Sequence, residues 1–171
     1  MNRQSIIILG IDPGYDRLGM AVIEKPAGAN GSKEVVLYSS CLQTSAKEDI
    51  YARFRKIGKV VAEIFDQYSP DVLAIENLFI TKNQKTAMRV SEVRGIIIYE
   101  AVKRDIPVHE YSPMQVKTSV TGDGTSDKAR IIKMVGLLVK LPKKKIIDDE
   151  YDAIAVALTC SARLKGRQAE R

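Results

Sequence analysis

The segment Ile6–Met20 (IIILGIDPGYDRLGM) constrains the fold more than any other part of the chain. Its apolar residues up to Ile11, interrupted only by Gly10, predict a buried central strand. Asp12 ends this run, where a charged carboxylate is costly unless something pairs with it. Gly10 and Gly14 leave room for a backbone or a ligand to come close. Because Asp-Pro-Gly is also ordinary turn chemistry, Asp12 is from this segment alone either a turn residue or part of a site.

The rest of the chain predicts a mixed α/β sheet of five strands flanked by helices. After the first strand, further strands are expected at residues 18–24, 35–42, 71–76 and 107–111. Short connections between the first three favour an antiparallel meander. Helices are expected at residues 45–68, 82–104, 127–140 and 149–164, with a short one starting at Ser112-Pro113. The pattern indicates helices on both faces of one sheet.

Two of these helices carry further signals. Ser45 and Glu48 predict a capping box at the start of the first long helix, ahead of an apolar stripe at alternating steps of four and three. The later part of the second long helix, residues 95–102, is apolar almost all round. Such a helix needs cover on two faces, and a second subunit is one element that could provide it.

The length and net charge of the chain limit the functions that it can have. The 171 residues fit a single domain spanning 1–171, with a short basic tail from about residue 165. Lys and Arg outnumber Asp and Glu by 27 − 21 = 6, which suits a polyanionic partner. Cys41 and Cys160 lie far apart and predict reduced core residues of a cytoplasmic protein. Because no apolar run approaches about 18 residues, neither a signal peptide nor a membrane span is expected.

Four carboxylates suggest a chemistry. Asp12 and Glu76 end two apolar strands, and Asp149 and Asp152 share one face at the start of the last helix. If that helix lies beside the strand ends, the acids converge and repel one another unless cations bind between them. An all-oxygen site suits Mg²⁺ or Mn²⁺ rather than zinc. Two such ions about 3.5–4 Å apart can activate a water and stabilise the leaving oxygen of a phosphodiester.

Each acid also has a structural interpretation. Asp148 or Asp149 could cap the last helix, and Glu76 could be a surface charge at a strand end. Because all of these positions carry acids within one basic chain, the cation site is favoured over the structural interpretations. Asp148 and Glu150 flank Asp149, so the register of the ligand at this position stays open.

Four motifs resemble those of the RuvC family, the bacterial crossover junction endodeoxyribonucleases. They are GIDPG at residues 10–14, AIENLF at 74–79, QVKTSVTGDGTSDK at 115–128 and DDEYDAIAVAL at 148–158, all in family order. The resemblance covers about residues 6–164. It implies an RNase H-like fold, a cytoplasmic homodimer, and paired, Mg²⁺-dependent nicking of four-way (Holliday) DNA junctions in recombination and repair. It also implies partnership with the RuvA–RuvB branch-migration complex.

The resemblance also assigns roles by position. Asp12, Glu76, Asp149 and Asp152 match the metal-binding acids, where Mn²⁺ is expected to substitute for two Mg²⁺ ions; some relatives carry His in place of Asp149. Lys117 and Lys128 match basic residues near the DNA, where a lysine can hold a phosphate or stabilise developing charge. A solvated surface charge is the alternative for either lysine.

A DNA-contacting segment follows the second acid. Phe79 matches an aromatic residue placed against bases at the junction centre, and stacking on an unpaired base would suit it if it is exposed. A core position is the alternative. Lys82 and Asn83 lie beside it and are also expected to bind DNA. The loop at residues 26–32 is longer than is usual in the family and lies away from the motifs.

Three rivals differ in class. Actin-like ATPases share a Gly-x-Asp-x-Gly turn but need a second phosphate-binding lobe, which 171 residues do not provide. An RNase H-fold relative acting on RNA is disfavoured by the QVK…DK stretch. A non-catalytic junction-binding protein is disfavoured because all four acids are present.

Overall fold

Strand β1 (Ile6–Asp12) lies inside the sheet with a neighbour on each side, as its apolar sequence requires. The computed structural model describes residues 5–27, 33–78 and 84–164. The described elements follow in the order β1, β2 (Arg17–Lys25), β3 (Glu34–Gln43), α1 (Ile50–Tyr68), β4 (Val72–Glu76), α2 (Gln84–Val102), β5 (Val108–Tyr111), α3 (Pro113–Thr121), α4 (Lys128–Leu138), β6 (Val139–Lys140) and α5 (Asp148–Arg163). The predicted α/β fold class is confirmed.

The sheet has six strands in the order β5-β4-β1-β2-β3-β6. Strands β1, β2 and β3 form the expected antiparallel meander, while β4 runs parallel to β1 and β5 runs parallel to β4. The sheet therefore has one strand more than the five predicted. Val139 and Lys140, predicted as the end of a helix, instead pair with Glu34 and Val35 at the edge of β3.

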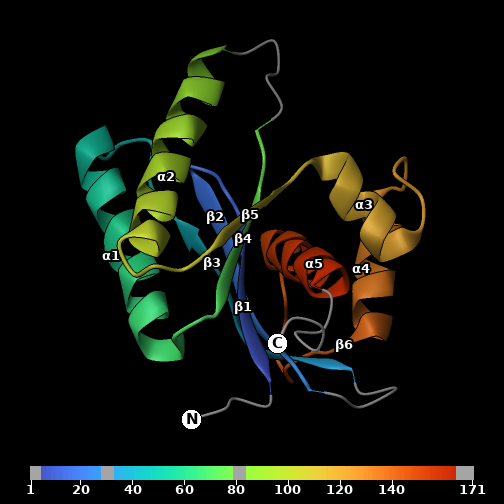
Figure 1. Ribbon diagram of the computed structural model, residues 1–171. Coiled ribbons are helices and arrows are strands. Elements are labelled where there is room, and N and C mark those ends of the chain that lie inside the picture. The colour runs from blue at the N-terminus through green and yellow to red at the C-terminus, as the bar shows by residue number, and fades with distance from the viewer. Residues whose placement is uncertain (1–4, 28–32, 79–83, 165–171) are drawn as a thin grey trace.

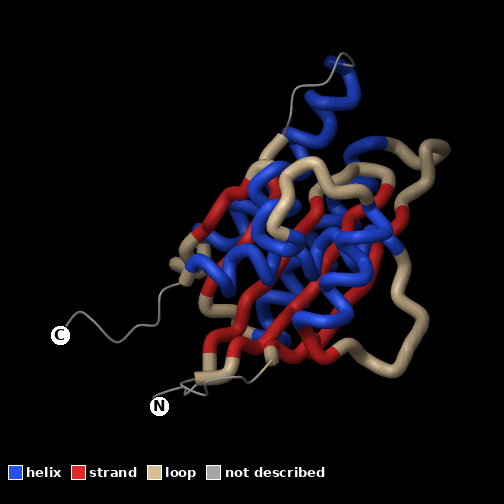
Figure 2. The backbone as a smooth tube through the Cα atoms, turned by 90° about the vertical axis from the view of Figure 1, so that its right-hand side faces the viewer, coloured by secondary structure: helices blue, strands red, loops and turns tan. Residues whose placement is uncertain are grey.

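Helices cover both faces of the sheet. Helices α1 and α2 lie on one face, and α3, α4 and α5 lie on the other (Figure 1). Viewed from the α3–α4 side, helices stand in front of the strands (Figure 2). Alternation along β1 serves both layers: Leu9 and Ile11 pack toward α1 and α2, and Ile8 packs toward α5. Gly10 and Asp12, in phase with Ile8, therefore face the α5 layer.

Helix α5 lies directly on the sheet because two strand residues are glycines. A Cβ atom on Gly10 would stand 2.4 Å from the Ala153 carbonyl oxygen, and one on Gly19 would stand 2.2 Å from the Asp149 carbonyl oxygen. Such separations are impossible for larger residues without moving the helix. Gly10 and Gly19 thus set the depth at which the first turns of α5 sit beside the end of β1.

Helix α1 begins later than predicted. The Ser45–Glu48 segment forms a turn, with the Glu48 amide donating to the Ser45 carbonyl at 3.0 Å. The helix starts at Ile50, and the Asp49 carboxylate accepts from the amides of Tyr51 and Ala52. Asp49 is the better cap because it directly precedes the apolar stripe, so both orphan amides lie within its reach.

The second long helix packs on α1 and the sheet but leaves an apolar face outward. Val93, Ile97 and Ala101 of α2 are buried in the core shared with α1 and the sheet, whereas Tyr99 and Val102 are 63% and 58% exposed. Apolar side chains on its outward face therefore have no cover within the described part of this chain. No described helix has the length and hydropathy to cross a membrane.

Several predicted features lie outside the described residues. They are Phe79, Lys82, Asn83, most of the loop at residues 26–32, and the basic tail from residue 165.

Candidate active site

Parallel pairing of β1 and β4 brings two acids to one edge of the sheet. Ile11 stands opposite Ile75, so Asp12 and Glu76 end neighbouring strands at the same level. Both face the α5 layer, because they continue the alternation of Gly10 on β1 and of Ala74 on β4. Asp152, in the second turn of α5, lines the same pocket of about 290 Å³.

Two lysines from other elements complete this pocket. Lys117 comes from α3 and Lys128 is the first residue of α4. Ser112 caps α3 in a capping box with Gln115, and Asp127 caps α4 by accepting from the Arg130 amide. The site is therefore built from two strand ends and three helices, and it unites five of the residues singled out in the sequence.

The charged forms of Asp12 and Glu76 are disfavoured in the folded protein. Burial, with added repulsion from Asp152 and Asp149, raises the pKa of Asp12 to about 6. Burial and repulsion from Asp12 and Asp152 raise the pKa of Glu76 to about 7. Within the described part of the chain, neither carboxylate forms an ion pair or accepts a hydrogen bond. Uncompensated acids of this kind are typical of functional sites.

Asp152 is in a different state, because Lys128 reaches it. The Lys128 ammonium donates to Asp152 at 2.7 Å and lies 3.7 Å from Asp148. The loop that leads into α4 is tied down by the Thr121 hydroxyl, which pairs with the Ser126 hydroxyl at 2.7 Å. Lys128 therefore projects from a fixed helix start onto the carboxylate.

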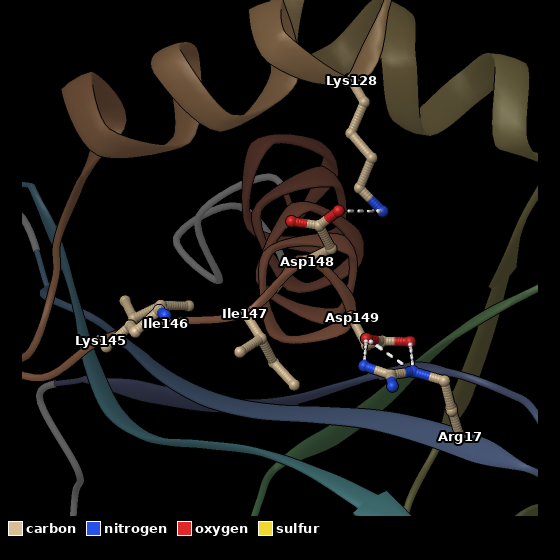
Figure 3. Close-up of a pocket in the computed structure, with 7 residues that line it drawn as sticks. All are labelled: Arg17, Lys128, Lys145, Ile146, Ile147, Asp148 and Asp149. Carbon is tan, nitrogen blue, oxygen red and sulfur yellow. Dashed lines mark hydrogen bonds and ion pairs between the residues drawn. The ribbon is translucent and has the colours of Figure 1, made fainter.

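Asp149 is held by an arginine that sequence reasoning missed. Arg17, at the start of β2, donates from Nε and Nη2 to the two carboxylate oxygens at 3.0 and 2.5 Å. These hydrogen bonds are the main reason why the pKa of Asp149 is lowered. Arg17, Asp149, Lys128 and Lys145 line a second pocket of about 440 Å³ at the start of α5 (Figure 3).

The structure separates the three adjacent acids at the start of α5. Glu150 is 5% exposed and accepts from the Ser39 hydroxyl and the Lys144 ammonium, both at 2.5 Å, so it anchors the helix. The Asp148 side chain is 67% exposed. Of the three, only Asp149 contributes to the raised pKa of Asp12. This geometry favours Asp149 over its neighbours as the partner of Asp12.

The donor set fits a hard divalent cation. It consists of carboxylate oxygens, and two of the four acids are uncompensated. Nevertheless, nowhere in residues 5–27, 33–78 or 84–164 do three acidic, His or Cys side chains gather closely enough to hold an ion as they stand. Two of the acids are drawn instead to Arg17 and Lys128. A cation would have to replace those contacts in order to use all four carboxylates.

Two buried arginines support the site from behind. Arg94 of α2 donates to the Glu76 carbonyl and pairs with Glu110. Arg53 of α1 is 4% exposed and donates to the Tyr15 carbonyl at 2.8 Å, which fixes the turn between β1 and β2. Arginines carry no sequence pattern that names their partners, so only the fold reveals these contacts.

The comparisons with known proteins agree on one family. The model of the RuvC family, described as crossover junction endodeoxyribonuclease RuvC, matches residues 8–160. The RuvC of Thermosipho melanesiensis is 43% identical over 150 residues, covering 88% of this chain and 93% of its own. The RuvC of Vibrio atlanticus is 43% identical over 153 residues, covering 90% and 85%.

Solved structures give the same result. Thermus thermophilus RuvC in complex with a Holliday junction substrate superposes with a TM-score of 0.82 at 30% identity, covering 90% of this chain and 92% of that one. The yeast mitochondrial Holliday junction resolvase Ydc2, at 15% identity and a TM-score of 0.65, shares the fold. The family match over most of the sequence and the superposition over most of the structure show that this chain belongs to the RuvC family of crossover junction endodeoxyribonucleases.

Proposed function

We propose that this protein is a structure-selective endonuclease that resolves four-way DNA junctions by paired, symmetric nicks during recombination and repair. The observation that carries the proposal is the convergence of Asp12, Glu76 and Asp152 on one pocket edged by Lys117 and Lys128. Family membership supports it, because the matched relatives are named for cleavage of crossover junctions. A non-catalytic junction binder or a nuclease acting on RNA has no comparable support.

Mg²⁺ is the proposed cofactor, with two ions per site and with Mn²⁺ as a substitute. Asp12, Glu76, Asp149 and Asp152 would hold it, since carboxylate oxygens are its preferred protein ligands. When bound, the ions supply an activated water and stabilise the leaving oxygen of the scissile phosphodiester.

The two lysines of the pocket have a separate role from the acids. Lys117 and Lys128 reach the same pocket as the acids from α3 and α4. They would hold the scissile phosphate against Asp12 and Glu76 and offset the negative charge that develops on it. Phe79, Lys82 and Asn83, outside the described residues, are proposed to contact the junction by resemblance alone.

A cleavage assay tests the function. The protein is incubated with a mobile four-way junction and with a linear duplex of matched sequence, with and without Mg²⁺. We expect symmetric nicks in the junction with Mg²⁺, no cleavage without it, and little cleavage of the duplex. Equal cleavage of both substrates would contradict structure selectivity, and tight junction binding without any Mg²⁺-dependent nick would favour the non-catalytic binder.

A homodimer through α2 is proposed to place two active sites on one junction. Met88, Tyr99 and Val102 on α2 are 66%, 63% and 58% exposed, so pairing with a second copy would cover apolar surface. A two-fold dimer presents two equivalent sites to two symmetric strands, as paired nicking requires. By resemblance, we also propose the RuvA–RuvB complex as a partner and the cytoplasm as the location.

Charge placed on this face should separate the subunits. We expect Tyr99→Asp to sediment as a folded monomer at micromolar concentration and to lose paired nicking, because a buried unpaired carboxylate is costly. Tyr51→Asp is the matched control, since Tyr51 on α1 is 71% exposed and lies outside the proposed interface. A wild-type protein that sediments as a folded monomer at this concentration would refute the dimer.

A further inference from the structure

The ion pair between Arg17 and Asp149 occupies a predicted metal ligand. The guanidinium meets the carboxylate with its fork, from Nε to Oδ1 at 3.0 Å and from Nη2 to Oδ2 at 2.5 Å. Both carboxylate oxygens are engaged, and the Asp149 side chain is only 19% exposed. A divalent cation that needs an oxygen of Asp149 must therefore compete with Arg17 for it. The contact acts as a substitute for the cation rather than as a support for it.

Arg17 projects from a fixed backbone, and its side chain is partly open to solvent. Arg53 holds the preceding turn through the Tyr15 carbonyl and the Asp16 carboxylate, which fixes the point from which Arg17 projects. The Arg17 side chain itself is 49% exposed. An exposed arginine on a fixed turn can change partner without disturbing the core.

The surroundings of Arg17 suit a phosphate. Arg17, Lys128 and Lys145 line one pocket beside the start of α5, with Arg17 and Lys128 on opposite sides of the helix (Figure 3). Lys128, 47% exposed, holds Asp152 as Arg17 holds Asp149. A guanidinium fork matches phosphate oxygens as well as it matches a carboxylate. DNA in this pocket would offer Arg17 an alternative anion.

We propose that Arg17 is a positioning residue that occupies Asp149 in the free protein and transfers to a backbone phosphate when DNA fills this pocket. Asp149 is then open to a divalent cation only in the presence of DNA. The inference rests on the proposed function, since it takes DNA as the ligand and Asp149 as a metal-binding acid. By linkage, DNA and the cation each raise the affinity for the other by the same factor.

The first test measures Mn²⁺ binding to the DNA-free protein from the spectroscopic signal of the unbound ion. We expect Arg17→Ala to bind Mn²⁺ about three- to tenfold more tightly than the wild type, the scale of releasing a bidentate, half-exposed ion pair. Arg55→Ala is the control for net charge, because Arg55 is an exposed arginine of α1 on the other face of the sheet.

A double variant separates this role from a structural one. If Arg17 acts through Asp149, the gain should disappear when Arg17→Ala is combined with Asp149→Asn. A gain that survives in the double variant, or an affinity no higher than that of Arg55→Ala, would overturn the proposal. Weaker Mn²⁺ binding by Arg17→Ala would overturn it in favour of an arginine that orients Asp149 as a ligand.

The second test addresses the transfer to phosphate. In junction binding without divalent ions, Arg17→Ala should lower the slope of log K against log salt by about one unit, and Arg55→Ala should not. An unchanged slope would overturn the transfer. The Mn²⁺ test uses neither DNA nor cleavage, so its result can be interpreted even if the wild-type protein does not cleave junctions. Unchanged Mn²⁺ binding by Arg17→Ala, alongside a wild type that does cut them, would overturn the Arg17 role alone.

Discussion

Replacing Asp12 by Asn, or Glu76 by Gln, is expected to lower the rate of junction cleavage by at least about a thousandfold, the scale of losing metal-ion catalysis. Binding of the junction should change little, because affinity for DNA comes mainly from Lys and Arg on phosphates. Single-turnover cleavage and a binding titration on the same junction measure both quantities. Asp152→Asn is expected to behave in the same way.

Asp148→Asn is the matched control. Asp148 is adjacent to Asp149, but its side chain is 67% exposed and it contributes nothing to the raised pKa of Asp12. The cleavage rate of the Asp148→Asn variant should stay within about threefold of the wild-type rate, because substitutions of exposed residues usually have small energetic effects. A large loss of cleavage rate in Asp148→Asn, together with a normal rate in Asp149→Asn, would identify Asp148 rather than Asp149 as the metal ligand. Loss of folding and binding together in the Asp12 and Glu76 variants would instead indicate structural acids.

The same variants should not be less stable in metal-free buffer. Asp12 and Glu76 have pKa values raised to about 6 and about 7 in the folded state, against about 4 for unfolded carboxyls. At pH values between about 4 and 7 the folded state binds more protons than the unfolded state. The free energy of unfolding therefore falls as the pH rises through this range. At pH 8 with EDTA, Asp12→Asn should stabilise the protein by about 1–3 kcal/mol. Added Mg²⁺ should raise the melting temperature of the wild type more than that of this variant.

Lys128→Ala is expected to lower the cleavage rate at saturating DNA by about 10- to 1000-fold, the scale of losing one donor to developing charge. Its ammonium lies 2.7 Å from Asp152, within the pocket that holds Asp12 and Glu76, so it is placed to act on a phosphate there. Binding should change little. Lys117→Ala is expected to show the same loss.

Lys133→Ala is the control, because Lys133 is an exposed lysine on the same helix. Single-turnover rates are compared with a salt titration of binding. If Lys128 only anchored the DNA backbone, its loss would leave the saturated rate normal. The salt slope of binding would instead fall by about one unit.

The parts of the fold with a strong local pattern could be predicted from the sequence. Apolar runs located β1 and β4, and the spaced stripe located α1. Val139–Lys140 could not be found, since two residues have no periodicity and join the sheet only because β3 offers an edge. The Ser45–Glu48 pattern was misleading, because a capping box acts only where an apolar stripe begins.

The sequence singled out the acids and lysines that line the pocket, but not the arginines around them. Asp12 and Glu76 end apolar runs, and a carboxylate in that position stands out in the sequence itself. Arg17 and Arg53 reach carboxylates 132 and 37 residues away in the sequence, and nothing local to either arginine names those partners. The charge balance of the site, in contrast to its list of acids, therefore depends on tertiary structure.

The docking of α5 over Gly10 and Gly19 has a consequence for protein synthesis. Asp12 and Glu76 leave the ribosome early, whereas Asp149 and Asp152 come from the last described helix. Because the ribosome works from the N-terminus, a nascent chain carries half of the acids long before it can acquire the others. The proposed nuclease therefore has no complete catalytic centre until α5 has been made and has closed onto β1. We therefore expect incomplete products of translation to lack metal-dependent cleavage activity.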